Sequence, residues 1–318
     1  MGNPNQSVHK ILVALDMTEL NISYAIDHGV DMVISHHPFL FKPIHDIDLS
    51  TCKGRMIENL IRHRITSFAA HTNLDSAVQG VNDALAEKLG LQECKGFVPV
   101  MTYSSYKFTL YITAAHAKLL KKKLDSLRGK DIESYYVVDD ADDFTENIRV
   151  EFRVPGQLVK QVKDMISSLD KSAKYDVYKL VNHGYKETMG RIGKFPFPMS
   201  VEEALSYIKN KLEIPVLRYA GNRDRLVEKI AILGGAGAEF AEVAKSMGAD
   251  LYLTGDLKYH EAQDAAMNGL VIADGGHFYT ERVIIPYLAK RLRDEFKTRG
   301  WNVGVLEDVR AKDIFHCV

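Results

Sequence analysis

Short apolar runs alternate with helix-length amphipathic segments near both ends of the chain. Residues 11–15 and 230–233 form apolar runs that have the length of buried strands. Each run is followed by a segment with helical spacing, a glycine turn and a second apolar run. Strands that alternate with helices in this way are typical of parallel sheets covered by helices. The pattern therefore predicts an α/β fold at both ends.

The two α/β segments repeat one another. Residues 10–16 match residues 229–235, and residues 29–37 match residues 248–256, so both pairs keep an offset of 219. Two stretches that share one offset indicate an internal repeat of a strand–helix–strand unit. We therefore expect two pseudo-repeated α/β halves, which would close together into one unit.

The middle of the chain has a different pattern of apolar residues. These residues first alternate like those of a half-buried strand and then take helical spacing, and this strand–helix order occurs twice. The expected elements are strand 106–113, helix 116–127, strand 149–154, helix 158–169 and strand 175–181. This rhythm predicts a small ferredoxin-like insert. The expected domains are a first α/β half at 1–98, the insert at 99–189 and a second α/β half at 190–318.

Composition narrows the class of protein. Hydrophobic residues make up 46% and charged residues 26% of the chain, an ordinary globular balance, and the net charge is −1. This charge argues against a nucleic-acid partner, and the basic run at 118–123 is interpreted as a solvated helix face. No apolar run is long enough to cross a bilayer. Three scattered cysteines, Cys52, Cys94 and Cys317, indicate neither disulfides nor a thiolate zinc site, so a cytoplasmic location is expected.

His36 and His37 are adjacent at the end of an apolar run that is predicted to be a strand. Inside a strand, neighbouring side chains point to opposite faces, so two adjacent imidazoles would not share a site there. Beyond the strand end this alternation lapses, and Pro38 favours an extended conformation at His37. Both rings can then enter one crevice. Two imidazoles in a crevice indicate a metal site, and two on consecutive residues indicate two ions.

Other metal-binding side chains follow further predicted strands. In parallel α/β sheets such loops meet beyond the carboxyl ends of the strands. His277 and Glu281 are four residues apart at the start of a helix and so face the same way, and Asp75 offers a hard oxygen ligand. A second carboxylate oxygen of Glu281 can bridge to a second ion. His71, at the start of the Asp75 loop, lies in the same polar segment.

Each of these residues also has a simpler interpretation. A lone histidine at a strand end is usually a structural or surface residue. Asp75 is in a position typical of an N-cap for the helix at 81–89. His277 and Glu281 can form an ordinary helix pair. The convergence of several such loops favours a metal site over these separate explanations, and Asp256 and His260 are then candidates for supporting or proton-transfer groups.

These motifs resemble a family of dinuclear-metal proteins, the GTP cyclohydrolase 1 type 2 homologues. The resemblance covers both halves in the same order and rests on four loops: Ser35-His36-His37-Pro38, His71-Thr72-Asn73-Leu74-Asp75, Leu253-Thr254-Gly255-Asp256 with Tyr259-His260-Glu261, and Asp274-Gly275-Gly276-His277-Phe278-Tyr279-Thr280-Glu281. It implies that the metal ligands are His36, His37, Asp75, His277 and Glu281, with His71 nearby in the pocket. It also implies a toroidal homohexamer, a trimer of dimers, and a PII/CutA-like fold for the insert.

The resemblance implies a hydrolase that uses two divalent metal ions per chain. Zinc is the first candidate for these ligands, with iron, manganese and nickel as alternatives. A metal-bound hydroxide would open the imidazole ring of a purine such as GTP or cleave a related small substrate, and His71 or His260 would move the proton. The alternative is a non-catalytic metal-binding hexameric scaffold or regulatory protein. No base-reading motif or triphosphate cradle in the sequence selects the substrate.

Overall fold

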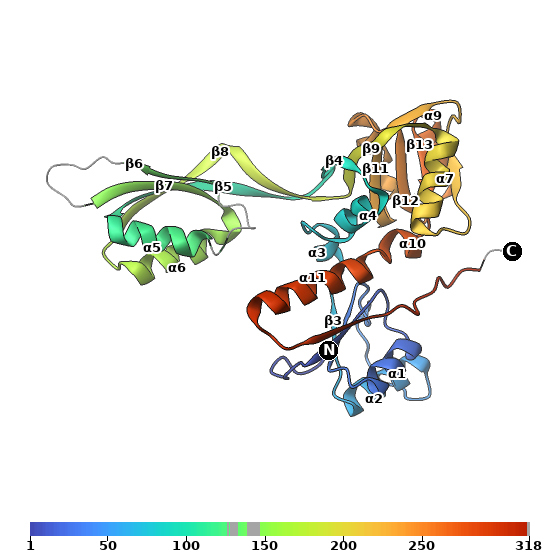
Figure 1. Cartoon of the computed structure of the whole chain (residues 1–318), viewed down its shortest axis with the longest axis horizontal. Coiled ribbons are helices and arrows are strands. Elements are labelled where there is room, and N and C mark those ends of the chain that lie inside the picture. Colours follow the sequence, from blue (N-terminus) through green and yellow to red (C-terminus); the bar gives the residue numbers. More distant parts are fainter. Residues whose placement is uncertain (126, 128–132, 139–146, 317–318) are drawn as a thin grey trace. The chain divides into compact units, whose positions relative to one another are not determined.

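The computed structural model describes residues 1–125, 127, 133–138 and 147–316 (Figure 1). It divides into two compact units. Unit 1 contains Met1–Val98 and Thr188–Val318, and unit 2 contains Pro99–Glu187. Cys317 lies outside the described residues, whereas Cys52 and Cys94 are free thiols. Within the described part of the chain, no helix is both long and apolar enough to span a bilayer.

Unit 1 contains two sheets. The first sheet is parallel throughout, and its order is β14 (Gly304–Glu307), β1 (Lys10–Ala14), β2 (Met32–Ser35), β3 (Thr66–Ala69). The second sheet has the order β10 (Arg218–Ala220), β13 (Val271–Asp274), β12 (Leu251–Gly255), β11 (Leu226–Ala236), β9 (Arg191–Ser200), β4 (Gln92–Lys95). Its three central strands β11, β12 and β13 are parallel, and its outer strands are antiparallel. The mixed α/β class expected from the sequence is therefore confirmed.

Helices cover both faces of the first sheet, because successive β1 side chains point to opposite sides. Ile11 and Val13 pack against α11 (Ile284–Arg299), and Leu12 and Ala14 pack against two further helices. These are α1 (Glu19–Asp27) and α2 (Cys52–Arg62). The second sheet follows the same rule. One face contacts α4 (Val81–Leu89) and α7 (Val201–Leu212), and the other contacts α8 (Ala241–Ser246) and α9 (Tyr259–Met267).

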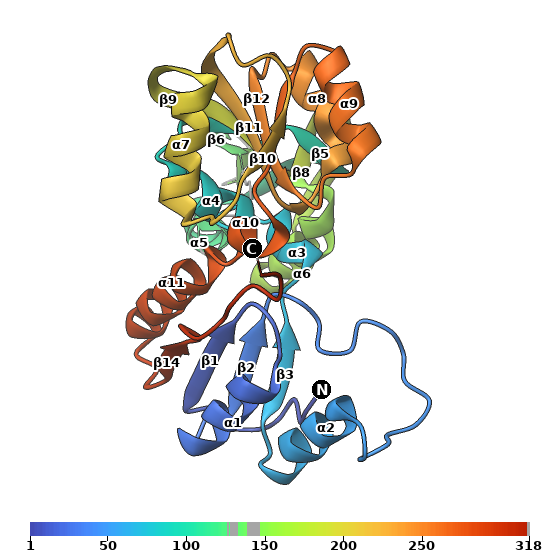
Figure 2. The same ribbon diagram turned by 90° about the vertical axis from the view of Figure 1, so that its right-hand side faces the viewer.

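Helix α4 connects the two sheets, because its side chains belong to both cores. Val81 and Ala84 pack with the first sheet, and Leu85 and Leu89 pack with the second. Two short helices lie beside it, namely α3 (Thr72–Asp75) and α10 (His277–Glu281). Figure 2 shows α3 and α10 next to the ends of β1, β2 and β3. The carboxyl-terminal loops of both sheets therefore meet in the middle of unit 1.

Two helix starts near the loop cluster have defined N-caps. Ser200 and Glu203 form a capping box at the start of α7. The alternative interpretation of Asp75 as an N-cap is wrong: the N-cap of α4 is Gly80, and Asp75 is the last residue of α3. The side chain of Asp75 is therefore available to the loop cluster, whereas its backbone oxygen accepts a hydrogen bond from Asn82.

Unit 2 contains one sheet with the order β6 (Glu133–Val138), β7 (Asn147–Pro155), β5 (Val98–Thr113), β8 (Lys174–Met189). Two helices, α5 (Ala114–Asp125) and α6 (Val159–Leu169), pack against it. Alternate residues of β5 and β7, such as Phe108 and Phe152, fill the core between sheet and helices. The lysines at 118 and 121–123 are exposed on α5, opposite the buried Leu120, which confirms that the basic run is a solvated helix face.

Candidate metal centre

The His36–His37 pair lies directly after β2. The backbone N–H groups of His36 and His37 donate to the carbonyls of Ala14 and Leu15, at 3.1 and 2.9 Å, so the chain stays attached to β1 beyond the regular strand. The Ser35 hydroxyl donates to the His37 carbonyl at 2.7 Å and closes a tight turn. As a result the two rings lie on the same side, with centroids 5.0 Å apart.

His277 and Glu281 lie at the two ends of α10, which follows β13. Gly276, immediately before the helix, has a φ of 74°, a left-handed conformation that favours glycine. One helical turn brings the Nε2 atom of His277 to 3.1 Å from the Oε2 atom of Glu281. The structure thus brings together side chains from the loops after β2, β3 and β13.

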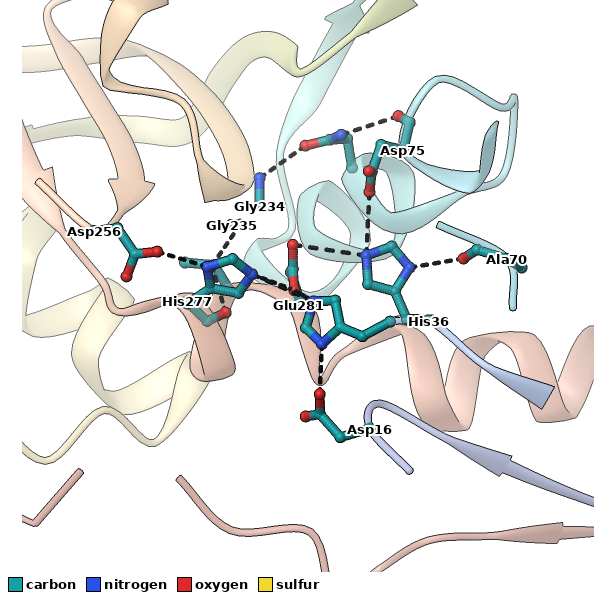
Figure 3. Close-up of polar contacts among 12 residues, drawn as sticks. Asp16, His36, Ala70, Asp75, Gly234, Gly235, Asp256, His277 and Glu281 are labelled. Carbon is teal, nitrogen blue, oxygen red and sulfur yellow. Dashed lines mark hydrogen bonds and ion pairs between the residues drawn. The ribbon is translucent and has the colours of Figure 1, made fainter. Parts of the chain in front are cut away.

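The carboxylate of Glu281 lies between two sets of ligand atoms (Figure 3). Its Oε1 atom is 3.6 Å from His36 Nε2, and that nitrogen is 3.5 Å from Asp75 Oδ1. Its Oε2 atom is 2.9 Å from His37 Nε2 and 3.1 Å from His277 Nε2. The inner set therefore consists of His36, Asp75 and Glu281, and the outer set consists of His37, His277 and Glu281. In each set the ligand atoms lie within 4.8 Å of one another.

Three buried polar atoms in this cluster have no hydrogen-bond partner among the residues that the structure describes. They are His36 Nε2, Asp75 Oδ1 and Glu281 Oε2. Leaving a buried polar atom unpaired costs about 1–3 kcal/mol, so native structures rarely do it without a reason. All three atoms are metal ligands by chemical type: His36 Nε2 and Asp75 Oδ1 belong to the inner set, and Glu281 Oε2 faces the outer set. The residues present therefore fit a pair of divalent cations that share the carboxylate of Glu281.

The other ring nitrogen of each histidine is already engaged. The Nδ1 atom of His36 contacts the Ala70 carbonyl at 2.8 Å. The Nδ1 atoms of His37 and His277 contact carboxylates of Asp16 and Asp256, each at 2.7 Å. Acceptors at Nδ1 hold the proton there and leave Nε2 with a lone pair directed into the cluster. This is the arrangement that metal-binding histidines usually show.

Asp256 is a supporting residue, as the sequence indicated, and Asp16 has an equivalent role that was not predicted. A signal was present in the spacing. Asp16 precedes His37 by 21 residues, and Asp256 precedes His277 by the same 21 residues. In both cases the aspartate follows one parallel strand and the histidine follows the neighbouring strand, so equal strand–helix–strand lengths produce the same contact.

The electrostatics of the cluster favour positive charge. Burial lowers the pKa of His37, but the nearby carboxylates of Asp16 and Glu281 outweigh it and raise this pKa to about 10. The carboxylate of Glu281 raises the pKa of His277 to about 9. Burial raises the pKa of Asp75 to about 6. For Glu281, burial is opposed by the three histidines, which hold its pKa well below the ordinary range. Protons therefore compensate the carboxylates when no cation does.

The two proton-transfer candidates have different positions. The ring of His71 lies 5.3 Å from that of His36 and 5.6 Å from that of His37, and the three histidines can themselves hold an ion. Burial and the neighbouring His36 lower the pKa of His71. His260 is exposed in the first turn of α9, where its ring packs edge-on against Tyr259. Among the described residues, His260 belongs to none of the candidate metal groups.

A pocket of about 670 Å³ opens beside the outer set. His37 and His277 are in its wall together with Asp16 and Asp256. The C-terminal segment, residues 312–315, forms another part of the wall. A volume of this size accommodates a small organic molecule.

The fold and this cluster define an α/β protein with a candidate dinuclear histidine–carboxylate metal centre. Residues 1–312 match the family model Duf34/NIF3 (NGG1p interacting factor 3), and the chain belongs to this family. It is 32% identical to a GTP cyclohydrolase 1 type 2 homolog of Halalkalibacterium halodurans over 99% of this chain and 91% of the relative. A homolog of the same name from Bacillus subtilis is 31% identical over 96% and 88%.

Solved structures agree with the family assignment. A Bacillus cereus protein related to NIF3 is 32% identical to this chain, with a TM-score of 0.89, and the match covers 100% of this chain and 92% of that protein. A Staphylococcus aureus protein is 27% identical, with a TM-score of 0.79 and coverage of 100% and 91%. The resemblance inferred from the sequence motifs is therefore confirmed.

Proposed function

We propose that this protein is a hydrolase that depends on two divalent metal ions, zinc before iron, manganese or nickel. The observation that carries the proposal is the bridging position of Glu281, whose two oxygens face separate ligand sets around unpaired buried atoms. The inner ion would be held by His36, Asp75 and Glu281, and the outer ion by His37, His277 and Glu281. Such ions supply a water activated to hydroxide near neutral pH and a charge clamp for the substrate.

The residues around the ions would orient the reaction. Asp16, Asp256 and the Ala70 carbonyl hold the three ligand rings in position. His71 lies beside His36 and His37 with a lowered pKa, so its neutral ring can accept a proton near neutral pH. We retain His71 as the proton-transfer residue in this proposal. The exposed position of His260 outside the cluster does not support the same role.

The substrate would occupy the pocket that His37 and His277 line. Its volume suits a nucleotide or another small cyclic or phosphorylated compound. The name shared by the curated relatives points to GTP, and opening of the purine imidazole ring is the reaction that we propose first. Hydrolysis of a related small substrate is the second.

The architecture supports two further parts of the proposal. Both sheets of unit 1 contain three neighbouring parallel strands in the order of the chain, which supports two pseudo-repeated halves. Unit 2 has the strand order and two helices that are typical of ferredoxin-like domains, which supports a PII/CutA-like insert. These relations would explain why the ligands come from both halves of unit 1.

We also propose a homohexamer built as a trimer of dimers. Several large apolar side chains of unit 1 are exposed, including Phe41, Ile47 and Phe68. Apolar side chains exposed together are typical of interaction surfaces. Light scattering on the purified protein tests the assembly: a mass near six times 35.8 kDa is expected, and a monomer would contradict it.

The decisive experiment combines metal analysis with a substrate screen. The wild type should hold two ions per chain and should turn over GTP or one member of a panel of nucleotides and phosphodiesters. Glu281→Ala should lose both ions and activity, because it removes a ligand from each set. His260→Ala is the matched control and should keep both ions. Fewer than one ion in the wild type, or unchanged metal content in Glu281→Ala, would contradict the dinuclear site. Two ions without turnover of any substrate would favour the metal-binding scaffold instead.

A further inference from the structure

A second pocket of unit 1 adjoins the pocket that His37 and His277 line, which we call the metal-facing pocket. The second pocket has a volume of about 440 Å³, and its wall comes from β10, from the residues after β12 and from the first turns of α9. Arg218 and Asp274 line both pockets. A molecule bound in the metal-facing pocket therefore lies next to the second pocket, which we call the Arg218 pocket.

Arg218 is held at this junction by strand pairing. β10 runs antiparallel to β13, and their register places Arg218 directly opposite Asp274. The side chain of Asp274 is 8% exposed, and its Oδ2 atom accepts a hydrogen bond from Arg218 Nη2 at 2.5 Å. Its Oδ1 atom accepts one from the backbone N–H of Gly276 at 3.1 Å. The buried carboxylate thus ties the guanidinium to the turn that precedes His277.

Most of the Arg218 guanidinium remains available to a ligand. The side chain is 71% exposed. Its Nη2 atom also contacts the Leu257 carbonyl at 3.5 Å, but within the described residues its Nε and Nη1 atoms donate no hydrogen bond. A guanidinium that is anchored at one nitrogen can bind the oxygens of a phosphate or carboxylate through the N–H groups of the other two.

The Arg218 pocket has an excess of positive charge. Its charged wall residues are Arg218, Lys258 and Asp274, and the Asp274 carboxylate is already paired with Arg218. Lys258 is 82% exposed, and its contact with Glu261 at 3.4 Å is an exposed ion pair of the kind that contributes little. The metal-facing pocket differs, because four aspartates line it against two cations, Arg218 and Lys312. An anionic group away from the ions is therefore favoured in the Arg218 pocket.

Two tyrosines complete the wall of the Arg218 pocket. Tyr219 is 41% exposed and Tyr259 is 75% exposed. A tyrosine presents an apolar ring and a hydroxyl donor, which suits the mixed surface of a sugar phosphate. A volume of about 440 Å³ accommodates such a group, and the larger metal-facing pocket accommodates the ring to which it is attached.

We propose that the Arg218 pocket is a phosphate subsite, in which Arg218 and Lys258 bind the phosphate of a phosphorylated ring compound whose ring lies in the metal-facing pocket. This inference rests on the proposed function, because that function places the reacting ring beside the ions. The subsite makes the protein select a nucleotide over the same ring and sugar without phosphate. Arg218 and Lys258 thus determine specificity and take no part in the bond-breaking step.

Calorimetric titration of the metal-loaded protein with GMP and with guanosine tests the subsite. These probes share the ring and the sugar and differ only in the phosphate. The wild type should bind GMP roughly 10- to 100-fold more tightly, which is the effect of charge-assisted hydrogen bonds to one phosphate. Arg218→Gln keeps a donor for Asp274 but removes the charge, so it should lose most of this preference without a change in guanosine affinity. Lys258→Ala, at an exposed position, should lose part of the preference.

Arg223→Gln is the matched control, because Arg223 is 63% exposed and pairs with Glu202 outside both pockets. This variant should bind GMP as the wild type does. Absence of GMP binding, equal binding of GMP and guanosine, or an unchanged preference in Arg218→Gln would overturn the proposal. The last of these results would mean that the phosphate binds the ions directly.

The binding result is independent of turnover. Selective binding of GMP through Arg218, without hydrolysis of any substrate, would contradict the proposed hydrolase and support the subsite. Turnover of an unphosphorylated compound by a protein with no preference for GMP would refute the subsite alone.

Discussion

Gly235 offers a test of the bridging carboxylate that separates metal binding from folding. Gly235 has a φ of 70°, and a Cβ atom built on it would lie 2.3 Å from Glu281 Oε1 and 3.3 Å from His277 Nε2. Gly29 is the matched control. Its φ is 61°, and a Cβ atom there would have no heavy atom within 4 Å. Gly29→Ala and Gly235→Ala therefore introduce the same backbone strain, but only the second displaces a metal ligand.

The expected magnitudes follow from this difference. An alanine in the left-handed region costs about 1–2 kcal/mol, so both variants should lose about this much stability. Unit 1 has roughly 230 residues, for which 1 kcal/mol corresponds to about 2–4 °C in Tm. Gly235→Ala should fold, because the end of the Glu281 side chain can move aside. However, that movement takes a ligand oxygen out of position, so the metal content should fall from two ions per chain to one or none.

The assay is metal analysis beside thermal unfolding of the chelated proteins. Gly29→Ala should keep two ions per chain. A Gly235→Ala variant that kept two ions would contradict the shared carboxylate, because displacement of Glu281 should remove a ligand from both sets. Loss of metal from Gly29→Ala would equally contradict it, since that residue lies outside the candidate metal groups.

Three further predictions concern stability and catalysis. At a free zinc concentration 100 times Kd, each bound ion adds about 2.7 kcal/mol to the free energy of unfolding. Chelation should therefore lower the wild-type Tm in calorimetry by roughly 10–20 °C, whereas the Tm of Glu281→Ala should hardly change. Arg191→Ala, which leaves the largely buried Asp83 without its cation, should cost about 3 kcal/mol in denaturant unfolding, against less than about 1 kcal/mol for the exposed Arg299→Ala. His71→Ala should retain two ions by metal analysis while kcat falls about 10²- to 10⁴-fold, and an unchanged kcat would exclude His71 as the proton-transfer group.

The ligand loops could be predicted because they follow strands whose signal is strong. The apolar runs before His36 and before Asp274 are β2 and β13 in the structure, and the carboxyl ends of parallel strands meet at one edge. The helical spacing of His277 and Glu281 likewise predicted that the two side chains share a face, and α10 confirms this. The local sequence pattern was therefore enough to predict the ligands whose positions depend on strand ends and helical turns.

Long-range strand pairing could not be predicted in the same way. β14, near the end of the chain, pairs with β1, and β4 of the N-terminal region pairs with β9. β14 and β4 have four residues each, and β4 is fully exposed, so neither of these two strands has a strong periodic signal. The partners of these two strands are determined by the tertiary packing of unit 1 and not by local sequence. The contact of His37 with Asp16 was missed for a related reason, because it depends on which strands are neighbours.

The adjacency of His36 and His37 explains how one short turn can serve two ligand sets. The two rings lie on the same side of the chain, but the His36 ring is buried whereas the His37 ring reaches the pocket. His36 reaches the Ala70 carbonyl after β3, whereas His37 reaches the Asp16 carboxylate after β1. The two rings are 5.0 Å apart, close enough for Glu281 to contact both. Separation of the pair by one inserted residue would rotate His37 out of the outer set, so such an insertion should remove the outer ion and leave the inner one in place.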